Sequence, residues 1–216
     1  IVKAHHAHPS SALAVGKAVQ AAVISCDLPE GTFSLLYGGG RTVGQRLVRH
    51  PALKAVGFTG SRSGGRALFD LAASRSAPIP VYAEMSSVNP VFLLPEALAE
   101  RGEEIALGLQ GSATLGAGQF CTNPGIVIYE NGDAGDAFKT AYAKAMNETA
   151  PATMLHSGIR DAFEKGVSAI TEISDIAILA DSGKERGPGG CSVSTAVFSV
   201  DAESFLSTKA LSEEIF

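Results

Sequence analysis

The strongest constraint on this chain is the alternation of short apolar strands with longer helices through its first half. Strand-like segments fall at residues 33–37, 55–59 and 79–84, and helix-like segments fall at residues 12–23 and 62–74. Strands separated by helices of about 10–15 residues are typical of βαβ units, whose strands run parallel. We therefore expect an α/β protein built on a doubly wound parallel sheet.

The pattern changes near Gly111, where a stretch rich in small residues leads into residues 119–125. We place a domain boundary within residues 95–112 and expect two domains, 1–110 and 111–216. The first should hold part of a Rossmann-like doubly wound parallel sheet, and the second should hold part of another α/β domain. The other predicted elements are strands at 90–94, 126–129, 176–180 and 191–200, and helices at 96–109, 133–147 and 159–173.

Composition and charge exclude several classes of function. With 45% hydrophobic and 18% charged residues, the chain can bury a core and is not expected to be disordered. Its net charge is −5, and no basic run is long enough to follow a phosphate backbone, so we expect no nucleic-acid partner. No apolar run reaches the ~20 residues that span a membrane, and the N-terminus does not resemble a signal peptide.

The two ends of the chain predict that it is an internal piece. The chain begins with Ile1 and not with methionine, and it ends at Phe216 without a Gly or Pro that would end a helix or strand. We expect that the first domain lacks its N-terminal part and the second lacks its C-terminal part.

The three cysteines indicate a reduced protein with one candidate nucleophile. Cys26, Cys121 and Cys191 are odd in number and far apart, which argues against a disulfide framework and for the cytoplasm. They also lack the spacing of a zinc site, and we expect no metal. Cys121 lies in a glycine-rich turn between a helix and a strand, where backbone amides can approach a reacting atom. The alternative for Cys121, and the simpler interpretation for the other two, is a small core residue.

Five short segments carry a resemblance to a known family. They are Val2-Lys3, Gly57–Ser61, Ala83–Pro90, Gly118–Cys121 and Glu213–Phe216. In this order they are similar to the V-K-P-x-E, F-T-G-S, E-L-G-G-K-N-P, G-Q-x-C and E-I-F-G-P motifs of the aldehyde dehydrogenase superfamily. Each motif is weak by itself, but five in the same order at fitting intervals make a specific pattern over nearly the whole chain.

The resemblance implies an NAD(P)-dependent oxidation of an aldehyde to a carboxylic acid. Cys121 would attack the aldehyde carbon to form a thiohemiacetal, which loses hydride to leave a thioester. Glu84 would activate the water that hydrolyses this thioester. The Cys121 backbone N–H would be one oxyanion donor, whereas the asparagine segment that supplies the family's other donor is not found in this chain.

The resemblance also assigns the residues of the first domain that would bind the adenosine end of the cofactor. Lys3 would contact the adenosine ribose. His6 occupies the position at which many NAD-preferring members carry a glutamate, so repulsion of a 2′-phosphate is removed. Arg41, after the Gly38–Gly40 turn, could pair with that phosphate. We therefore expect NADP as the cofactor, with NAD as the second choice. The alternative interpretation is that His6 and Arg41 are solvated surface residues.

Four further residues would contact the rest of the cofactor. Gly60 and Ser61, at the start of a helix, would bind pyrophosphate through exposed amides and the positive helix end. Glu214 would bind the nicotinamide ribose, and Phe216 would pack near the ring. The resemblance further implies a homo-oligomer, a dimer or a tetramer.

Within the superfamily, residues 3–9, 57–62 and 84–90 are most similar to the α-ketoglutaric semialdehyde (2,5-dioxovalerate) dehydrogenase group. NADP-dependent fatty-aldehyde dehydrogenases are an alternative. A second alternative is a truncated, catalytically incompetent fragment that serves only as a folded scaffold. A Cys/His hydrolase with His156 as base is a third, although no Asn or Asp that would orient the histidine is identifiable.

Overall fold

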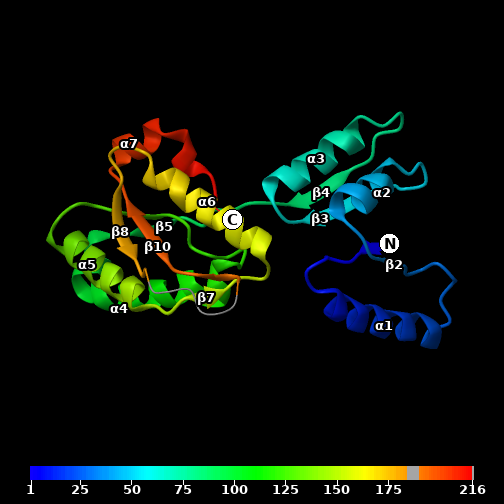
Figure 1. Cartoon of the computed structure of the whole chain (residues 1–216), viewed down its shortest axis with the longest axis horizontal. Helices are drawn as coiled ribbons and strands as arrows, with labels where there is room; N and C mark the ends of the chain where they lie inside the picture. Colours follow the sequence, from blue (N-terminus) through cyan, green and yellow to red (C-terminus); the bar gives the residue numbers. More distant parts are fainter. Residues whose placement is uncertain (184–189, 216) are drawn as a thin grey trace. The chain divides into compact units, whose positions relative to one another are not determined.

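The computed structural model describes residues 1–183 and 190–215, which form two compact units, Ile1–Met85 and Ser86–Phe216 (Figure 1). Helices and strands alternate in both units, so the predicted α/β class is confirmed. The predicted domains 1–110 and 111–216 stay a prediction. The helix Pro95–Thr114 packs against another helix of the second unit and therefore belongs to that unit.

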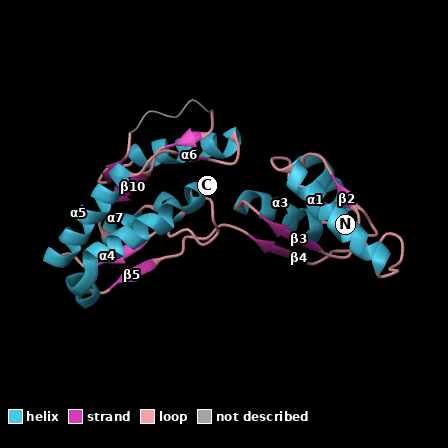
Figure 2. Ribbon diagram, turned by 90° about the horizontal axis from the view of Figure 1, so that it is seen from below, coloured by secondary structure: helices cyan, strands magenta, loops and turns pink. Residues whose placement is uncertain are grey.

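The first unit contains two parallel strand pairs. Strand β1 pairs with β2, and β3 pairs with β4 in the register Val56↔Val81 to Thr59↔Glu84. Figure 2 shows helix α3 beside β3 and β4, which it connects as a βαβ unit. The elements of this unit are β1 Val2–Lys3, α1 Pro9–Ser25, β2 Leu35–Leu36, η1 Gly40–Gly44, α2 Gln45–Arg49, β3 Val56–Thr59, α3 Arg62–Ala73 and β4 Val81–Glu84.

Local sequence explains where helices α1 and α3 begin. Pro9 opens α1 at a position where its missing N–H needs no partner. Ser61 is the N-cap of α3, and its hydroxyl accepts a hydrogen bond from the Gly64 N–H at 3.3 Å. Gly65 lets α3 approach the end of β4, since a Cβ there would lie 2.5 Å from the sulfur of Met85.

The second unit is built on a parallel pair, β5 with β6, and two antiparallel pairs, β7 with β9 and β8 with β10. Its elements are β5 Val91–Leu93, α4 Pro95–Thr114, η2 Leu115–Gly118, β6 Val127–Tyr129, α5 Asp133–Glu148, β7 Ala152–Thr153, α6 Ser157–Thr171, β8 Ala177–Asp181, β9 Ser192–Val193, β10 Ala196–Ser199, α7 Ala202–Ser207 and η3 Lys209–Ser212. The sequence predicted a single strand at 191–200, which the structure divides into β9 and β10.

The core of the second unit lies between α4 and α5. It is an aliphatic and aromatic cluster that includes Phe138, which is 2% exposed. The Phe138 ring meets Tyr129 edge-on at 5.5 Å and stacks on Tyr142 at 5.8 Å, which are geometries that aromatic pairs prefer. This packing fixes β6, and therefore the end of the Cys121 segment that leads into it.

The exposed faces of the small parallel sheets are partly apolar. Side chains alternate along the strands, and Tyr82 of β4 and Phe92 of β5 are 72% and 67% exposed.

Among the described residues, none of the helices combines the length and the apolar character that a membrane span requires.

Candidate functional site

Glu84 is the last residue of β4 in the first unit. It is exposed, and its carbonyl accepts a hydrogen bond from the Gly60 N–H at 3.1 Å. An open hollow at the same place is lined by Gly57, Phe58, Thr59, Tyr82, Ala83 and Glu84. Glu84 therefore lies at the carboxyl end of a parallel strand, the edge at which ligands bind in open α/β sheets.

Gly60 and Ser61 connect that edge to helix α3. Gly60 has φ +156°, and a Cβ there would lie 2.8 Å from the Phe58 ring, so the turn requires glycine. Ser61 then caps the helix. The predicted pyrophosphate-binding pair is thus placed at the N-terminus of a 12-residue helix.

Lys3 lies at the end of β1, and its ammonium joins two backbone segments. Nζ donates to the carbonyls of Ala4 at 3.0 Å and Gly38 at 3.1 Å. Gly38 begins the turn that leads to Arg41, which is exposed in η1. The structure therefore brings the Lys3 side chain to the turn that precedes Arg41.

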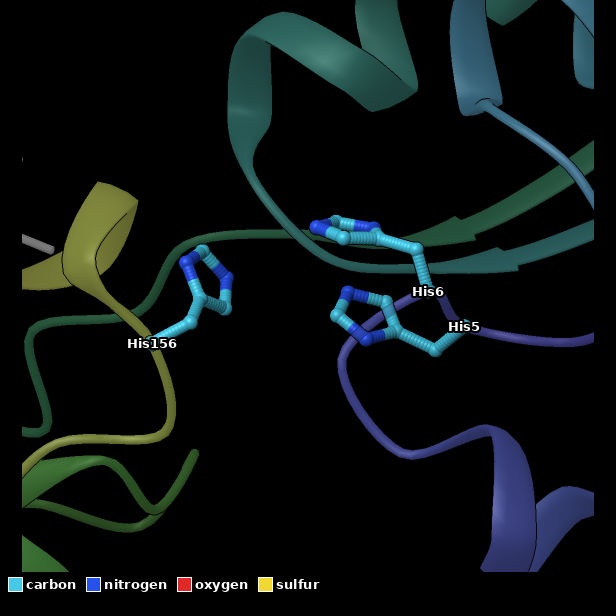
Figure 3. A group of neighbouring side chains, drawn as sticks. All are labelled: His5, His6 and His156. Atoms are coloured by element: carbon cyan, nitrogen blue, oxygen red, sulfur yellow. The ribbon is translucent and has the colours of Figure 1, made fainter.

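Histidines gather in the loop before α1. The His5 ring lies 4.5 Å from that of His6 and stacks on His8 at 5.0 Å, measured between centroids. Figure 3 labels His5 and His6 of this loop and, separately, His156. His156 belongs to the second unit, where it precedes α6.

Cys121 is exposed in the turn that follows η2. Its carbonyl oxygen accepts two hydrogen bonds, from the Ser87 hydroxyl and from the Asn89 side-chain amide, both at 2.8 Å. The same amide donates to the Asn123 carbonyl at 2.9 Å. The Gly125 N–H donates to the Val88 carbonyl at 2.9 Å, so the Cys121 turn is joined to residues 87–89 by both side chains and backbone.

Glu214 lies in the extended segment after η3 and is half-buried. Its neighbour Ile215 packs on α6, where a Cβ at Gly166 would lie 2.5 Å from an Ile215 methyl group. Phe216 lies outside the described residues. Among the predicted site residues, the first unit holds Lys3, His6, Arg41, Gly60, Ser61 and Glu84, and the second unit holds Cys121 and Glu214.

The sequence profile of the aldehyde dehydrogenase family matches residues 1–161. The chain belongs to this family.

Similar curated aldehyde dehydrogenases include two bacterial relatives. Alpha-ketoglutaric semialdehyde dehydrogenase 2 from Azospirillum brasilense is 48% identical over 216 residues, which are 100% of this chain and 41% of the relative. Alpha-ketoglutaric semialdehyde dehydrogenase from Acinetobacter baylyi is 44% identical over 170 residues, which are 79% of this chain and 32% of the relative. The chain spans about two fifths or less of the length of these relatives.

Solved structures of low sequence identity share the fold. Proline utilization A from Bdellovibrio bacteriovorus superposes with a TM-score of 0.80 at 20% identity, over 99% of this chain and 22% of that one. Glyceraldehyde-3-phosphate dehydrogenase GapN from Methanocaldococcus jannaschii, complexed with NADP, has a TM-score of 0.76 at 18% identity, over 97% of this chain and 45% of that one.

Three residues that hold the Cys121 turn have no role predicted from the sequence. They are Ser87, Asn89 and Gln119, which stand inside the family motifs. The Gln119 side chain donates to the Gly116 carbonyl at 2.8 Å and accepts from the Leu155 N–H at 2.9 Å. Asn89 could have been suspected, because Asn takes a left-handed backbone more readily than most residues, and its φ here is +40°.

Proposed function

We propose that this chain carries the nucleophile and the general base of an NAD(P)-dependent aldehyde dehydrogenase that forms a carboxylic acid. The observation that supports the proposal best is the environment of Cys121. An exposed thiol stands in a family motif, on a turn whose backbone is held by Ser87 and Asn89. A thiol that is accessible and held in one place is what nucleophilic catalysis requires.

In the proposed reaction, the Cys121 thiolate attacks the aldehyde carbon and forms a C–S bond. The negative charge moves to the aldehyde oxygen, which the Cys121 N–H stabilises. When the C=O bond forms again, hydride leaves the carbon and a thioester remains on Cys121. Glu84 removes a proton from water as the water attacks the thioester, the C–S bond breaks, and the carboxylic acid and the thiolate are released.

Residues of the first unit fit the anionic part of a nicotinamide dinucleotide, which supplies the hydride acceptor when bound. Ser61 opens a helix whose first-turn amides and positive dipole favour phosphate. The Lys3 ammonium lies beside the Gly38 turn, and Arg41 is exposed just after it. We propose NADP as the preferred cofactor, with His6 and Arg41 accommodating the 2′-phosphate and Glu214 and Phe216 at the nicotinamide end.

We propose α-ketoglutaric semialdehyde as the substrate, because the two curated relatives at 48% and 44% identity carry that activity in their names.

We further propose that the whole protein is a homo-oligomer and that it is located in the cytoplasm. Three cysteines without a disulfide are compatible with a reducing compartment.

The test is the oxidation of α-ketoglutaric semialdehyde by the whole protein with NADP+ or NAD+. Cys121→Ala should abolish the formation of reduced cofactor and leave cofactor binding intact, as followed by fluorescence titration. Cys26→Ala is the matched control, since Cys26 is also exposed but lies at the end of α1. Turnover by Cys121→Ala would overturn the proposal. A preparation of this chain by itself that neither binds nor reduces either cofactor would support the scaffold alternative.

A further inference from the structure

The Cys121 carbonyl is held by two side chains that the proposed chemistry does not use. The Ser87 hydroxyl and the Asn89 amide each donate to it at 2.8 Å. Ser87 stands where the similar family motif has glycine, so its hydroxyl is an additional donor in this chain. We refer to Ser87 and Asn89 as the carbonyl clamp.

Asn89 is suited to this contact by both its backbone and its amide. Its φ of +40° is a left-handed conformation that Asn adopts more readily than most residues, and its side chain is partly buried. Its two amide hydrogens face the carbonyls of Cys121 and Asn123 at 2.8 and 2.9 Å, and the Ser87 oxygen lies 3.0 Å away. One side chain therefore holds the carbonyls of the two residues on either side of Thr122.

The turn that bears Cys121 needs an external hold of this kind. Gly116, Ala117 and Gly118 have φ of +58°, +60° and +73°, so three consecutive residues are left-handed just before it. Glycine makes such a segment pliable, and Gly116 at its start is exposed. Holding the Cys121 carbonyl restricts the ψ angle of that residue, and therefore the directions from which its thiol can approach a substrate.

We propose that Ser87 and Asn89 are positioning residues that orient the Cys121 thiol for attack on a carbonyl carbon. This inference rests on the proposed role of Cys121 as the nucleophile. Attack on a carbonyl requires a particular approach of the sulfur and an adjacent N–H for the oxyanion, and small displacements can reduce such rates by about 10²-fold. Alkylation by a small reagent requires mainly that the thiol is accessible and ionised. Comparing the two rates therefore separates the orientation of the Cys121 thiol from its exposure to solvent.

The experiment compares acylation and alkylation of Cys121 in the whole protein. Acylation is followed by the burst of p-nitrophenolate from p-nitrophenyl acetate, in which the thiolate forms a thioester and the phenolate leaves with the electron pair. Alkylation by iodoacetamide is followed by peptide mass mapping, with Cys26 of the same molecule as the internal reference. Cys121→Ala gives the background of both reactions.

Four variants test the carbonyl clamp. Asn89→Gly keeps access to the left-handed backbone and removes the amide, whereas Ser87→Ala removes only the hydroxyl. Ser87→Thr restores a hydroxyl. Ser86→Ala is the matched control, because Ser86 is an exposed neighbour outside the clamp.

We expect Asn89→Gly to slow acylation by about tenfold or more and Ser87→Ala by about two- to tenfold, the effect of losing one hydrogen bond or more. Ser87→Thr should recover the rate, and Ser86→Ala should not change it. Alkylation of Cys121 relative to Cys26 should change less than about twofold in all four variants, since access to the thiol is kept.

Two results would overturn the inference. Unchanged acylation in both Asn89→Gly and Ser87→Ala would show that the clamp does not orient the thiol. Equal losses of acylation and alkylation, with a lower unfolding temperature, would show that it only stabilises the fold. If the wild-type protein does not oxidise aldehydes, but acylation of Cys121 is still slower in the clamp variants, the proposed function is refuted and the role of the clamp is kept.

Discussion

A glycine in helix α5 offers a quantitative test of the packing in the second unit. Gly135 is buried, and a Cβ there would lie 2.5 Å from the Glu130 carbonyl oxygen and 2.9 Å from the Tyr129 ring. Carbon and carbonyl oxygen in contact are normally about 3.3–3.6 Å apart. Gly135→Ala must therefore displace the backbone between β6 and α5. Rotation of a side chain cannot relieve this clash, because the nearest atom belongs to the backbone.

Gly108 in helix α4 is the matched control. It is exposed, and no atom lies within 4 Å of a Cβ built there. Alanine is favoured over glycine in a helix interior by about 0.8–1.0 kcal/mol, so Gly108→Ala should raise the free energy of unfolding by about that amount. Gly135 lies in the first turn of α5, where the gain in propensity is at most that amount, and overpacking against backbone costs about 3 kcal/mol, the upper end of the usual range. We expect a net loss of about 2 kcal/mol there, and a difference of about 3 kcal/mol between the two variants.

Urea unfolding followed by far-UV circular dichroism measures both variants. A change in midpoint at constant slope reports a change in stability, and 1 kcal/mol corresponds to about 2–4 °C in a thermal scan for a protein of this size. Equal stabilisation by the two alanines would refute the reasoning, because it would mean that the space at Gly135 can accept a methyl group.

Three further predictions concern the proposed site and the core. Glu84→Gln should give a burst of reduced cofactor and then a slow phase, because hydrolysis of the thioester loses its base; unaltered steady-state turnover in stopped flow would contradict this. Arg41→Ala should weaken NADP+ binding by about tenfold or more and spare NAD+ in paired titrations, and equal losses would exclude a contact with the 2′-phosphate. Burial raises the pKa of Tyr142 to about 12, so folding favours the neutral phenol, and the free energy of unfolding should fall as the pH rises from 10.0 towards 12. Tyr142→Phe should remove that part of the pH dependence in urea titrations, and an unchanged slope would contradict the assignment.

Five elements of the first unit, α1, β2, β3, α3 and β4, were predictable because their signals are local. Apolar runs located β3 and β4, and the Gly60-Ser61 pair marked the turn between β3 and α3. The parallel pairing of β3 with β4 followed from the helix between them, since a crossover of that length returns the chain in the same direction. Local chemistry and global topology agree in this part of the chain.

The later strands were less predictable because their partners are distant in sequence. Residues 191–200 alternate like one strand, but β9 pairs with β7 and β10 pairs with β8. Alternation specifies which side chains share a face and does not specify the neighbour. The short helix α7 was missed, although Asp201 accepts a hydrogen bond from the Ser204 N–H at 2.8 Å, a capping contact that an Asp followed three residues later by Ser could have suggested.

The segment around Cys121 depends most on contacts that are distant in sequence. The motif around Cys121 predicted a reactive thiol from residue types alone, and the glycines before it predicted a tight turn. Ala117 in that turn has φ +60°, a conformation that costs an ordinary L-residue about 1–2 kcal/mol. The turn is supported by hydrogen bonds from Ser87 and Asn89, which precede their partners by 32 to 34 positions. The hydrogen bond from the Leu155 N–H to the Gln119 side chain, 36 positions apart, supports it as well. Since alanine at position 117 has no local preference for a left-handed backbone, these distant contacts hold the turn, and a sequence motif can name a candidate nucleophile without giving the orientation of its thiol.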